Sequence, residues 1–279
     1  MDRLKRIAKK GFSPSSLSLF LKDPLDFYHQ RVMGIRENQT LDVTINNMDK
    51  GNLVHEVLEA LYLPYQNKIL KAPDFDEMRL RLIPLMEDKY QSIYHGNEKR
   101  TGRNYIIFEV LKKSILDFLA IEEAHVNRGN EIKILALEKS FEHFINIPEL
   151  DFPVKLIGIV DRMDQFNGAL RIIDYKTGLI LPKQLRIQDW NALRGDTDLA
   201  YLFQILIYSY VHADTISSYS ESSAGIISFR NLPEYFMPFE LKIDHSHALS
   251  NDNLNNFKMV LLELMREIFD SRIPFKANI

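Results

Sequence analysis

The dipeptide Asn167-Gly168 constrains the fold of this chain more than any other feature of the sequence. It joins two strand-like runs, VKLIGIVDRMDQF and ALRIIDYKTG. Asn-Gly between such runs is the strongest short-range signal for a β-hairpin with a type I′ turn. If the dipeptide occupies the two central turn positions, Phe166 faces Ala169, and every opposed pair has residue numbers that add up to 335. The middle of the chain is therefore expected to form an antiparallel strand pair whose register can be counted.

The counted register brings two carboxylates together. Asp161 faces Asp174, and the Cβ atoms of opposed residues lie about 4.5–5.5 Å apart. Asp164 faces Arg171, an attractive pair that supports the register independently. Side-chain alternation puts Asp161, Asp174 and Lys176 on one face of the hairpin. The other members of that face are apolar: Ile159, Met163, Leu170 and Ile172. Because the two acids repel each other, we expect the proton affinity of at least one of them to rise.

Two uncompensated acids on an apolar face are energetically costly, so we expect a cation to balance their charge. Mg²⁺ prefers oxygen ligands and is commonly held by one or two carboxylates together with phosphate oxygens and water. Lys176 could then orient a water molecule or stabilise charge on an attacked phosphate. The pattern indicates metal-assisted hydrolysis of a phosphodiester. A structural alternative stays open, in which Lys176 bridges the two aspartates as an ion-pair triad with a net charge of about −1.

The periodicity of the remaining chain changes from helical to strand-like near residue 130. Two further strands are expected after the hairpin, and an apolar segment between them and the hairpin is typical of a buried helix. We predict an α/β fold with a central mixed β-sheet flanked by helices. One domain should span residues 1–279, with a mainly helical part over 1–130 and a sheet-containing part over 131–279. The expected helices lie at 15–33 with a break at Pro24, 47–62, 74–94, 105–126, 197–213 and 254–268, and the further strands at 131–147, 224–231 and 235–243.

Composition excludes several kinds of protein. The 35 Lys and Arg residues against 38 Asp and Glu give a net charge of −3, so any DNA-binding surface must be a local basic patch. The absence of cysteine excludes disulfides, thiolate zinc sites and iron–sulfur clusters. No apolar run approaches the ~18 residues of a membrane span, and no secretory signal is evident, so we expect no membrane contact and a cytoplasmic location. The basic run over residues 1–10 is interpreted as a frayed, solvated terminus rather than a phosphate contact.

The hairpin segment GIVDRMDQFNGALRIIDYKTG closely resembles the nuclease core of the RecB/AddB-like branch of the PD-(D/E)XK nuclease superfamily. That core has a Gly-x-x-Asp-Arg and an Asp-Tyr-Lys-Thr-Gly element. Three other segments are similar to the same branch, in the same order: SPSSLSLFLKDPLDFYHQRVMGI to its opening helix, GNLVHEVLEALY to its Gly-x-x-x-His helix and QILIY to its Gln-x-x-x-Tyr helix. The resemblance covers residues near 13 to 210 and implies a restriction-endonuclease-like core with a helical N-terminal part.

The resemblance implies a role for each matched residue of the centre. Asp161 and Asp174 would be the acids that bind Mg²⁺ or Mn²⁺, and Lys176 would be the catalytic lysine. His55 would be a further metal ligand, and the main-chain carbonyl of Tyr175 would complete the coordination.

Supporting roles follow for residues around this centre. Gln204 and Tyr208, four residues apart on one helix, would contact substrate or orient the lysine, although mutual hydrogen bonding within the core explains them equally well. Arg162 should point to the other face of the sheet, with a structural or a DNA-facing role. Gly51, one helical turn before His55, should allow that helix to approach the sheet closely.

The sequence departs from many relatives of this branch in one respect. Asp23-Pro24 stands where they have a Cys-Pro pair, so no iron–sulfur cluster can form. No Walker-type Gly-x-x-x-x-Gly-Lys-Ser/Thr run occurs either, so this chain has no ATP site of that type, and a helicase motor would be a separate subunit or domain.

The function that these features predict is hydrolysis of DNA. We expect a nuclease, acting as an exonuclease in recombination and repair on DNA that is single-stranded or has free ends. Two alternatives stay open: a non-catalytic DNA-binding or scaffold subunit of a helicase–nuclease complex, and a metal-dependent phosphatase acting on small substrates. The complete set of two acids and a lysine argues against the non-catalytic alternative.

Overall fold

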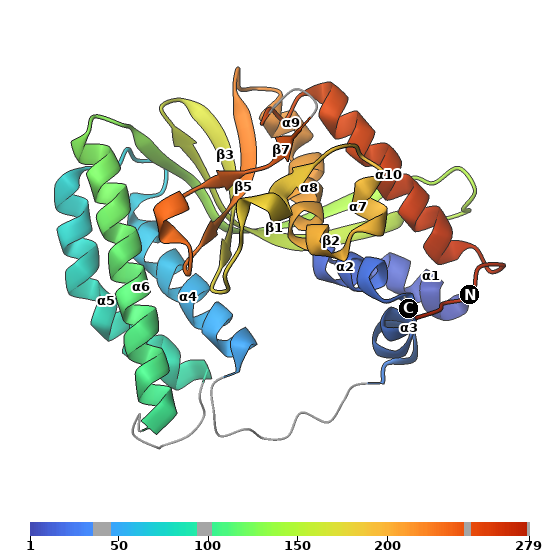
Figure 1. Ribbon diagram of the computed structural model, residues 1–279, viewed down its shortest axis with the longest axis horizontal. Coiled ribbons are helices and arrows are strands. Elements are labelled where there is room, and N and C mark those ends of the chain that lie inside the picture. Colours follow the sequence, from blue (N-terminus) through green and yellow to red (C-terminus); the bar gives the residue numbers. More distant parts are fainter. Residues whose placement is uncertain (36–45, 94–101, 243–246, 278–279) are drawn as a thin grey trace.

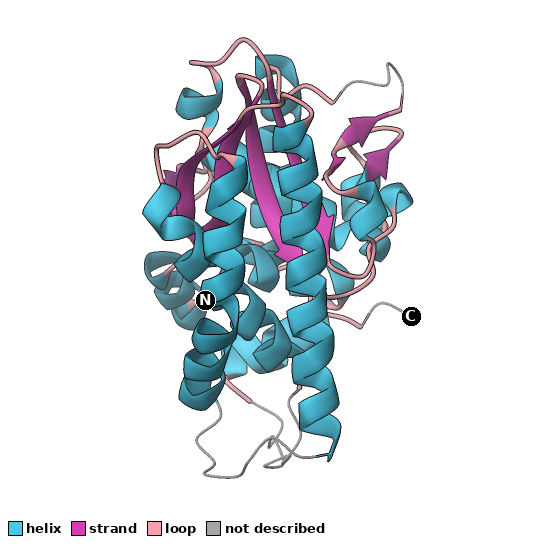
Figure 2. Ribbon diagram, turned by 90° about the vertical axis from the view of Figure 1, so that its left-hand side faces the viewer, coloured by secondary structure: helices cyan, strands magenta, loops and turns pink. Residues whose placement is uncertain are grey.

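The computed structural model describes residues 1–35, 46–93, 102–242 and 247–277. Its centre is a five-stranded mixed sheet with the order β1-β2-β3-β5-β6, and helices cover both faces (Figures 1 and 2). The predicted α/β class with a central mixed sheet is therefore confirmed. The strands are β1 Ile132–Ile145, β2 Val154–Phe166, β3 Ala169–Lys176, β5 Ser222–Ser228 and β6 Met237–Pro238, and a separate small sheet pairs β4 Arg186–Ile187 with β7 Glu240–Leu241.

Helices precede the first strand, as the periodicity predicts. The expected first helix is interrupted at the proline, where Asp23 ends one helix and its side chain caps the next. The helices before β1 are α1 Asp2–Lys10, α2 Pro14–Lys22, α3 Pro24–Phe27, the π-helix η1 Tyr28–Met33, α4 Asn47–Tyr62, the 3₁₀-helix η2 Leu63–Tyr65, α5 Ala72–Ile93 and α6 Gly102–Asn127. Those after β3 are η3 Pro182–Leu185, α7 Ala192–Gly195, η4 Thr197–Leu199, α8 Ala200–Val211, α9 Ala213–Ile216, η5 Leu232–Glu234 and α10 Asn251–Phe269.

Two of the expectations from the sequence are wrong. The N-terminal basic run is not a frayed terminus, because it forms α1, whose Leu4 and Ala8 are buried in the core. The strand expected over 235–243 is divided into the short strands β6 and β7, which belong to different sheets. Pro238 at the end of β6 has no N–H to donate, which limits the ladder there. Within the described residues, no helix is long and apolar enough to cross a membrane.

The hairpin register is confirmed over most of its length. Asn167 and Gly168 have φ angles of 53° and 87°, as a type I′ turn requires, and Asp164 pairs with Arg171. The paired ladder ends at Arg162 and Ile173, one position before the two aspartates. It ends there because the Asp161 carboxylate accepts the N–H of Tyr175 at 2.6 Å, in place of a backbone carbonyl.

The sheet separates two apolar clusters and so lets helices reach the end of β3 from both sides. One cluster contains Met163, Leu170 and Ile172 of the hairpin together with residues of α1, α2, α8 and α10. The other contains Ile173 and Tyr175 together with residues of α4, α5 and α6. The end of β3 therefore lies between α4 on one face and α8 on the other (Figure 1).

Candidate active site

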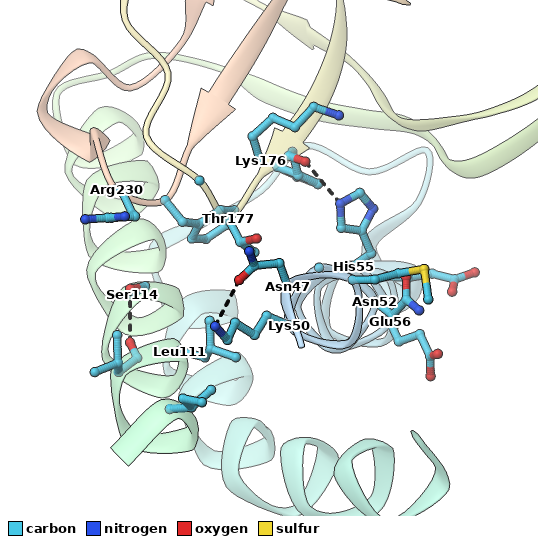
Figure 3. A pocket seen from close by; sticks show the side chains of 18 of the residues that line it. Asn47, Lys50, Asn52, His55, Glu56, Leu111, Ser114, Lys176, Thr177 and Arg230 are labelled. Carbon is cyan, nitrogen blue, oxygen red and sulfur yellow. Dashed lines mark hydrogen bonds between the residues drawn. The ribbon is translucent and has the colours of Figure 1, made fainter. Parts of the chain in front are cut away.

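His55 lies at the centre of the candidate site and projects from α4 toward the end of β3 (Figure 3). Asn46 precedes the helix as its N-cap and its side chain forms a capping box with Asp49, so the first turn is fixed. The Nε2 atom of His55 is 3.1 Å from the carbonyl oxygen of Tyr175. Its Nδ1 atom is 3.3 Å from Glu138 and 3.5 Å from Asp161. Both ring nitrogens therefore face acceptors, and the ring must carry two protons to donate to both sides.

The surroundings of His55 favour this charged form. Burial by itself lowers the pKa of His55, but the hydrogen bond with Glu138 and the charges of Asp161 and Asp174 outweigh it, and the pKa is raised to about 9. The imidazolium ring thus partly balances the negative charge of the surrounding carboxylates, Glu138, Asp161 and Asp174.

Glu138 of β1 belongs to this cluster although the sequence does not reveal it. One ligand atom from each of His55, Glu138 and Asp161 lies within 4.8 Å of the other two. The Asn-Gly turn fixes the register of β2 with β3, but residues 146–153 between β1 and β2 give no such count. The ladder between β1 and β2 also shifts at Ile134 and Ala136, and Glu138 itself has a φ of 42°. An irregular strand of this kind cannot be placed by alternation.

Asp161 shows the raised proton affinity that the register predicts. The residue is 6% exposed. Burial and the neighbouring Asp174 raise its pKa, while His55, the N–H of Tyr175 and Lys176 lower it, and the net direction is upward.

Asp174 and Lys176 form the second part of the site. The Lys176 Nζ atom is 2.8 Å from Asp174 Oδ2, and it donates a hydrogen bond to Gln204 Oε1 at 3.0 Å. The Gln204 amide in turn donates to the Tyr208 hydroxyl at 2.6 Å. Burial by itself lowers the pKa of Lys176, but the charge of Asp174 outweighs it and the pKa is raised, so the ammonium group stays charged.

These contacts bear on two alternatives that the sequence left open. The ion pair joins Lys176 to Asp174, whereas Asp161 contacts His55 and the N–H of Tyr175, so the lysine is not placed as a symmetrical bridge between the two acids. Gln204 both bonds to Tyr208 and holds the lysine, so the structural and the orienting interpretations describe the same contacts.

The expectations for Gly51 and Arg162 need correction. A Cβ atom added to Gly51 would meet no atom of the described residues within 4 Å, so this glycine does not serve close approach to the sheet. It lines an open groove instead. Arg162 points to the other sheet face as expected, but it is 0% exposed, so a DNA-facing role is wrong.

Arg162 belongs to a buried ionic network behind the site. Its guanidinium pairs with Glu122 at 3.0 Å and with Asp164, and Nη1 donates to the Tyr175 hydroxyl at 3.2 Å. Arg171 pairs with Asp164 through two hydrogen bonds of 2.8 Å. Two cations and two anions thus balance in a buried region. Glu122 has a sequence signal, because it falls on the same stripe as the apolar residues of its helix: Ile115, Phe118 and Leu119.

A groove of about 980 Å³ opens over this site. His55, Glu138 and Lys176 lie on its floor, and α6 forms a wall on which Ile106 and Val110 are 62% and 57% exposed. Lys50 of α4 and Arg230 after β5 also line it (Figure 3). The groove therefore combines cations, an apolar wall and the titratable cluster.

The donor set fits a hard divalent cation. Carboxylate oxygens, a main-chain carbonyl and one imidazole nitrogen are ligands that Mg²⁺ or Mn²⁺ accepts. Asp174 Oδ2 is buried and, within the described residues, has no aligned hydrogen-bond donor, although the Lys176 ammonium lies beside it. A buried oxygen left without a donor in this position has capacity for a cation.

Comparison with known proteins decides the family. Residues 11–278 match the model of the PD-(D/E)XK nuclease superfamily. This chain belongs to the PD-(D/E)XK nuclease superfamily. Members of this superfamily are generally metal-dependent nucleases, and the restriction-endonuclease-like core expected from the sequence agrees with the observed sheet and flanking helices.

Several proteins related to this PD-(D/E)XK chain are much longer than it is. An uncharacterized protein of Rickettsia conorii is 24% identical over 267 residues, which cover 91% of this chain and 30% of that protein. An uncharacterized protein of Rickettsia bellii is 22% identical, with 95% and 31% covered. A subunit of an ATP-dependent helicase/nuclease of Listeria monocytogenes is 26% identical over 167 residues, or 57% of this chain and 12% of that protein. The last match agrees with the RecB-like resemblance of the sequence motifs.

Proposed function

We propose that this chain is a Mg²⁺- or Mn²⁺-dependent DNA nuclease that acts as an exonuclease on single-stranded or end-containing DNA in recombination and repair. One observation carries the proposal. His55, Glu138 and Lys176 line one groove, and their partners Asp161 and Asp174 are buried beside them. Two acids, a histidine and a charged lysine in this arrangement support metal-assisted hydrolysis of a phosphodiester.

The proposed metal ligands are His55, Glu138, Asp161, Asp174 and the main-chain carbonyl of Tyr175. A bound divalent cation would neutralise charge on the phosphate and activate water for attack. To accept it, His55 must give up one of the protons that it shares with the surrounding oxygens. Asp161 is held in place for this role by the N–H of Tyr175.

Lys176 is the proposed catalytic cation. An ammonium group has three donors. Gln204 accepts a hydrogen bond from one of them and Asp174 lies beside the group as its ion-pair partner, which leaves donor capacity for the substrate or the attacking water. Gln204 and Tyr208 are positioning residues in this proposal, because they fix the direction of the lysine side chain. Arg162 supports the same strand from behind, through its contact with the Tyr175 side chain.

The walls of the groove support a substrate with unpaired bases. Lys50 and Arg230 are suited to the phosphate backbone, and the exposed Ile106 and Val110 are suited to the faces of bases. Bases stacked within a duplex would not offer those faces to the wall. The match to part of a helicase/nuclease supports action beside a helicase subunit or domain. We also propose that residues 1–279 form one domain, because elements from both parts of the chain contribute to each apolar cluster.

The direct test is digestion of end-labelled single-stranded and double-stranded DNA in Mg²⁺, in Mn²⁺ and in EDTA, analysed on a gel. We expect stepwise shortening of the single strand from an end in either metal and none in EDTA. Lys176→Ala should be inactive, and Lys113→Ala, a change at an exposed lysine of α6, should be as active as the wild type. Metal-independent binding without cleavage would favour the non-catalytic subunit. Release of phosphate from small monoesters without DNA cleavage would favour the phosphatase.

A further inference from the structure

A second groove, which is lined by basic residues, lies between α1 and η1, away from the catalytic groove. It has a volume of about 390 Å³. Four cations line it: Arg3, Arg6 and Lys10 from α1 and Arg31 from η1. Among the described residues that line this groove, none is acidic; the others are Ile7, Val32, Met33 and Gly34. The net charge of the chain is −3, so four cations around one small groove form a local patch of positive charge on a protein that is slightly negative as a whole.

The helix geometry of α1 concentrates these charges. Arg3, Arg6 and Lys10 follow one stripe of the helix, while Leu4 and Ala8 on another stripe are buried. The Arg3 guanidinium donates to the carbonyls of Val32 at 3.3 Å and Met33 at 3.4 Å, which ties α1 to the end of η1.

Helix stability explains only part of this set of cations. Lys10 lies in the last turn of α1, where a positive charge is favourable, but the same does not hold for Arg3. Arg3 lies in the first turn of α1, where a positive charge opposes the helix dipole. Within the described part of the chain, Arg6, Lys10 and Arg31 have no acidic partner at ion-pair distance. These like charges repel one another, and a bound anion would reduce that repulsion. The groove is therefore suited to binding an anion.

The backbone fixes this groove relative to the catalytic strand. Directly after α1, the Phe12 N–H donates to the Lys155 carbonyl at 2.8 Å, and the Ile157 N–H donates to the Phe12 carbonyl at 2.9 Å. Gly11 has a φ of 117°, and a Cβ atom there would lie 2.6 Å from the Ile157 side chain, so only glycine fits this junction. Asp161 follows Leu156, the bridge partner of Phe12, by five residues on β2, which is about 16 Å of strand.

We propose that the groove between α1 and η1 binds backbone phosphates of the DNA strand that is cleaved at the catalytic cluster. The inference rests on the proposed nuclease function. Guanidinium groups bind phosphate through paired hydrogen bonds, and three of the four cations are arginines. A strand held at both places is anchored away from the reacting phosphodiester, so the groove would raise the affinity for long strands without touching the reacting atoms.

The test compares charge reversals on the two sides of the groove. The first variant is Arg6→Glu with Lys10→Glu, and the second is Arg31→Glu, which places a similar change on η1. The matched control is Lys9→Glu, an exposed residue of the same helix that does not line the groove. Affinity for a labelled 20-nucleotide single strand is measured by fluorescence anisotropy in EDTA over a series of salt concentrations. Melting curves of all variants identify any that fail to fold.

We expect the α1 double variant to bind the 20-nucleotide strand about tenfold or more weakly than the wild type at low salt. The slope of log affinity against log salt should become shallower by about 0.7 for each phosphate that the variant no longer binds. Arg31→Glu should act in the same direction, and Lys9→Glu should have a much smaller effect. The difference from the wild type should decrease as the strand is shortened, because a short strand at the catalytic cluster cannot reach α1.

Folded variants that lose no more affinity than Lys9→Glu would overturn the inference. Cleavage by the wild type in Mn²⁺, measured separately, shows which proposal has failed. Cleavage with no dependence of binding on Arg6, Lys10 or Arg31 refutes the groove and leaves the nuclease proposal intact. Groove-dependent binding with no cleavage in any metal refutes the nuclease proposal instead.

Discussion

Metal binding at the candidate site should depend steeply on pH, with a sign that follows from the proton held by His55. In the metal-free protein both ring nitrogens face oxygens, and the pKa of His55 is raised to about 9. A metal ligand must offer a nitrogen without a proton. The metal therefore competes with a proton at every pH below about 9, and the apparent affinity should rise as the pH rises.

The size of the effect can be estimated from the pKa of His55. Each pH unit below that pKa costs about 1.4 kcal/mol for removal of the proton. His55 is still half protonated at pH 9, so between pH 7 and pH 9 the apparent affinity should rise about 50-fold, or about 2.3 kcal/mol, from His55 alone. The raised pKa of Asp161 acts in the same direction. We expect log affinity to rise with a slope of between about 1 and 2 per pH unit, and to level off once His55 has lost its proton.

Stability of the metal-free protein should show the opposite trend. A group whose pKa is higher in the folded state than in the unfolded state holds its proton more tightly when folded. The stabilisation from His55 is then fully present below its unfolded pKa of about 6.5 and is lost as the pH rises through about 9. Bound Mg²⁺ should restore stability in that same window, so the metal-induced rise in melting temperature should grow from pH 6.5 to pH 9.

Calorimetric titration of Mg²⁺ in two buffers with different ionisation enthalpies measures both the affinity and the number of protons released. The wild type at pH 7 should release at least about one proton for each metal bound. His55→Ala should bind more weakly and release fewer protons, whereas His29→Ala, a change at an exposed histidine, should match the wild type. An affinity independent of pH, or equal proton release by His55→Ala and the wild type, would refute the reasoning.

Three further predictions concern single residues. Lys176→Ala should abolish cleavage on the gel. Calorimetry should show an unchanged or slightly higher Mg²⁺ affinity, because a cation beside the metal is removed. Loss of metal binding would instead mean that the lysine keeps the two aspartates in place. Glu138→Gln should weaken Mg²⁺ binding by about tenfold or more, and an unchanged affinity would remove this residue from the ligand set. Arg162→Met should lower the free energy of unfolding by about 3–5 kcal/mol, because it leaves the buried Glu122 carboxylate without its cationic partner. In denaturant unfolding, Lys113→Met should change little, and an equally small effect for Arg162→Met would contradict the buried network.

The hairpin is predictable from the sequence because one turn fixes its register. Asn167-Gly168 leaves a single way to count the pairs, and the count correctly pairs Asp164 with Arg171. The same count places Asp161 near Asp174, but it does not predict that the backbone pairing stops one position earlier, at Arg162 and Ile173. The Asp161 side chain replaces a backbone acceptor for the Tyr175 N–H. Such a replacement does not change the alternation of apolar and polar residues, so the sequence pattern cannot reveal it.

The remainder of the site depends on contacts between distant segments. Glu138 comes from a strand whose register is irregular, so its place beside His55 cannot be counted. The basic N-terminus is helical although its charge density suggests solvation. Its two small apolar contacts at Leu4 and Ala8, together with the backbone pairing of Phe12, outweigh that tendency. Contacts of this kind join segments that are distant in the sequence, so local sequence patterns cannot predict them.

The central claim is that His55, Glu138 and Asp161 hold a divalent metal beside Lys176. The most direct measurement is an anomalous difference map from crystals soaked in Mn²⁺, collected for the wild type and for Asp161→Asn. We predict a strong anomalous peak in contact with these three side chains in the wild type, and a weak peak or none there in the variant. A Mn²⁺ peak located elsewhere, or an equal peak in both crystals, would contradict the assignment of this cluster as the metal centre.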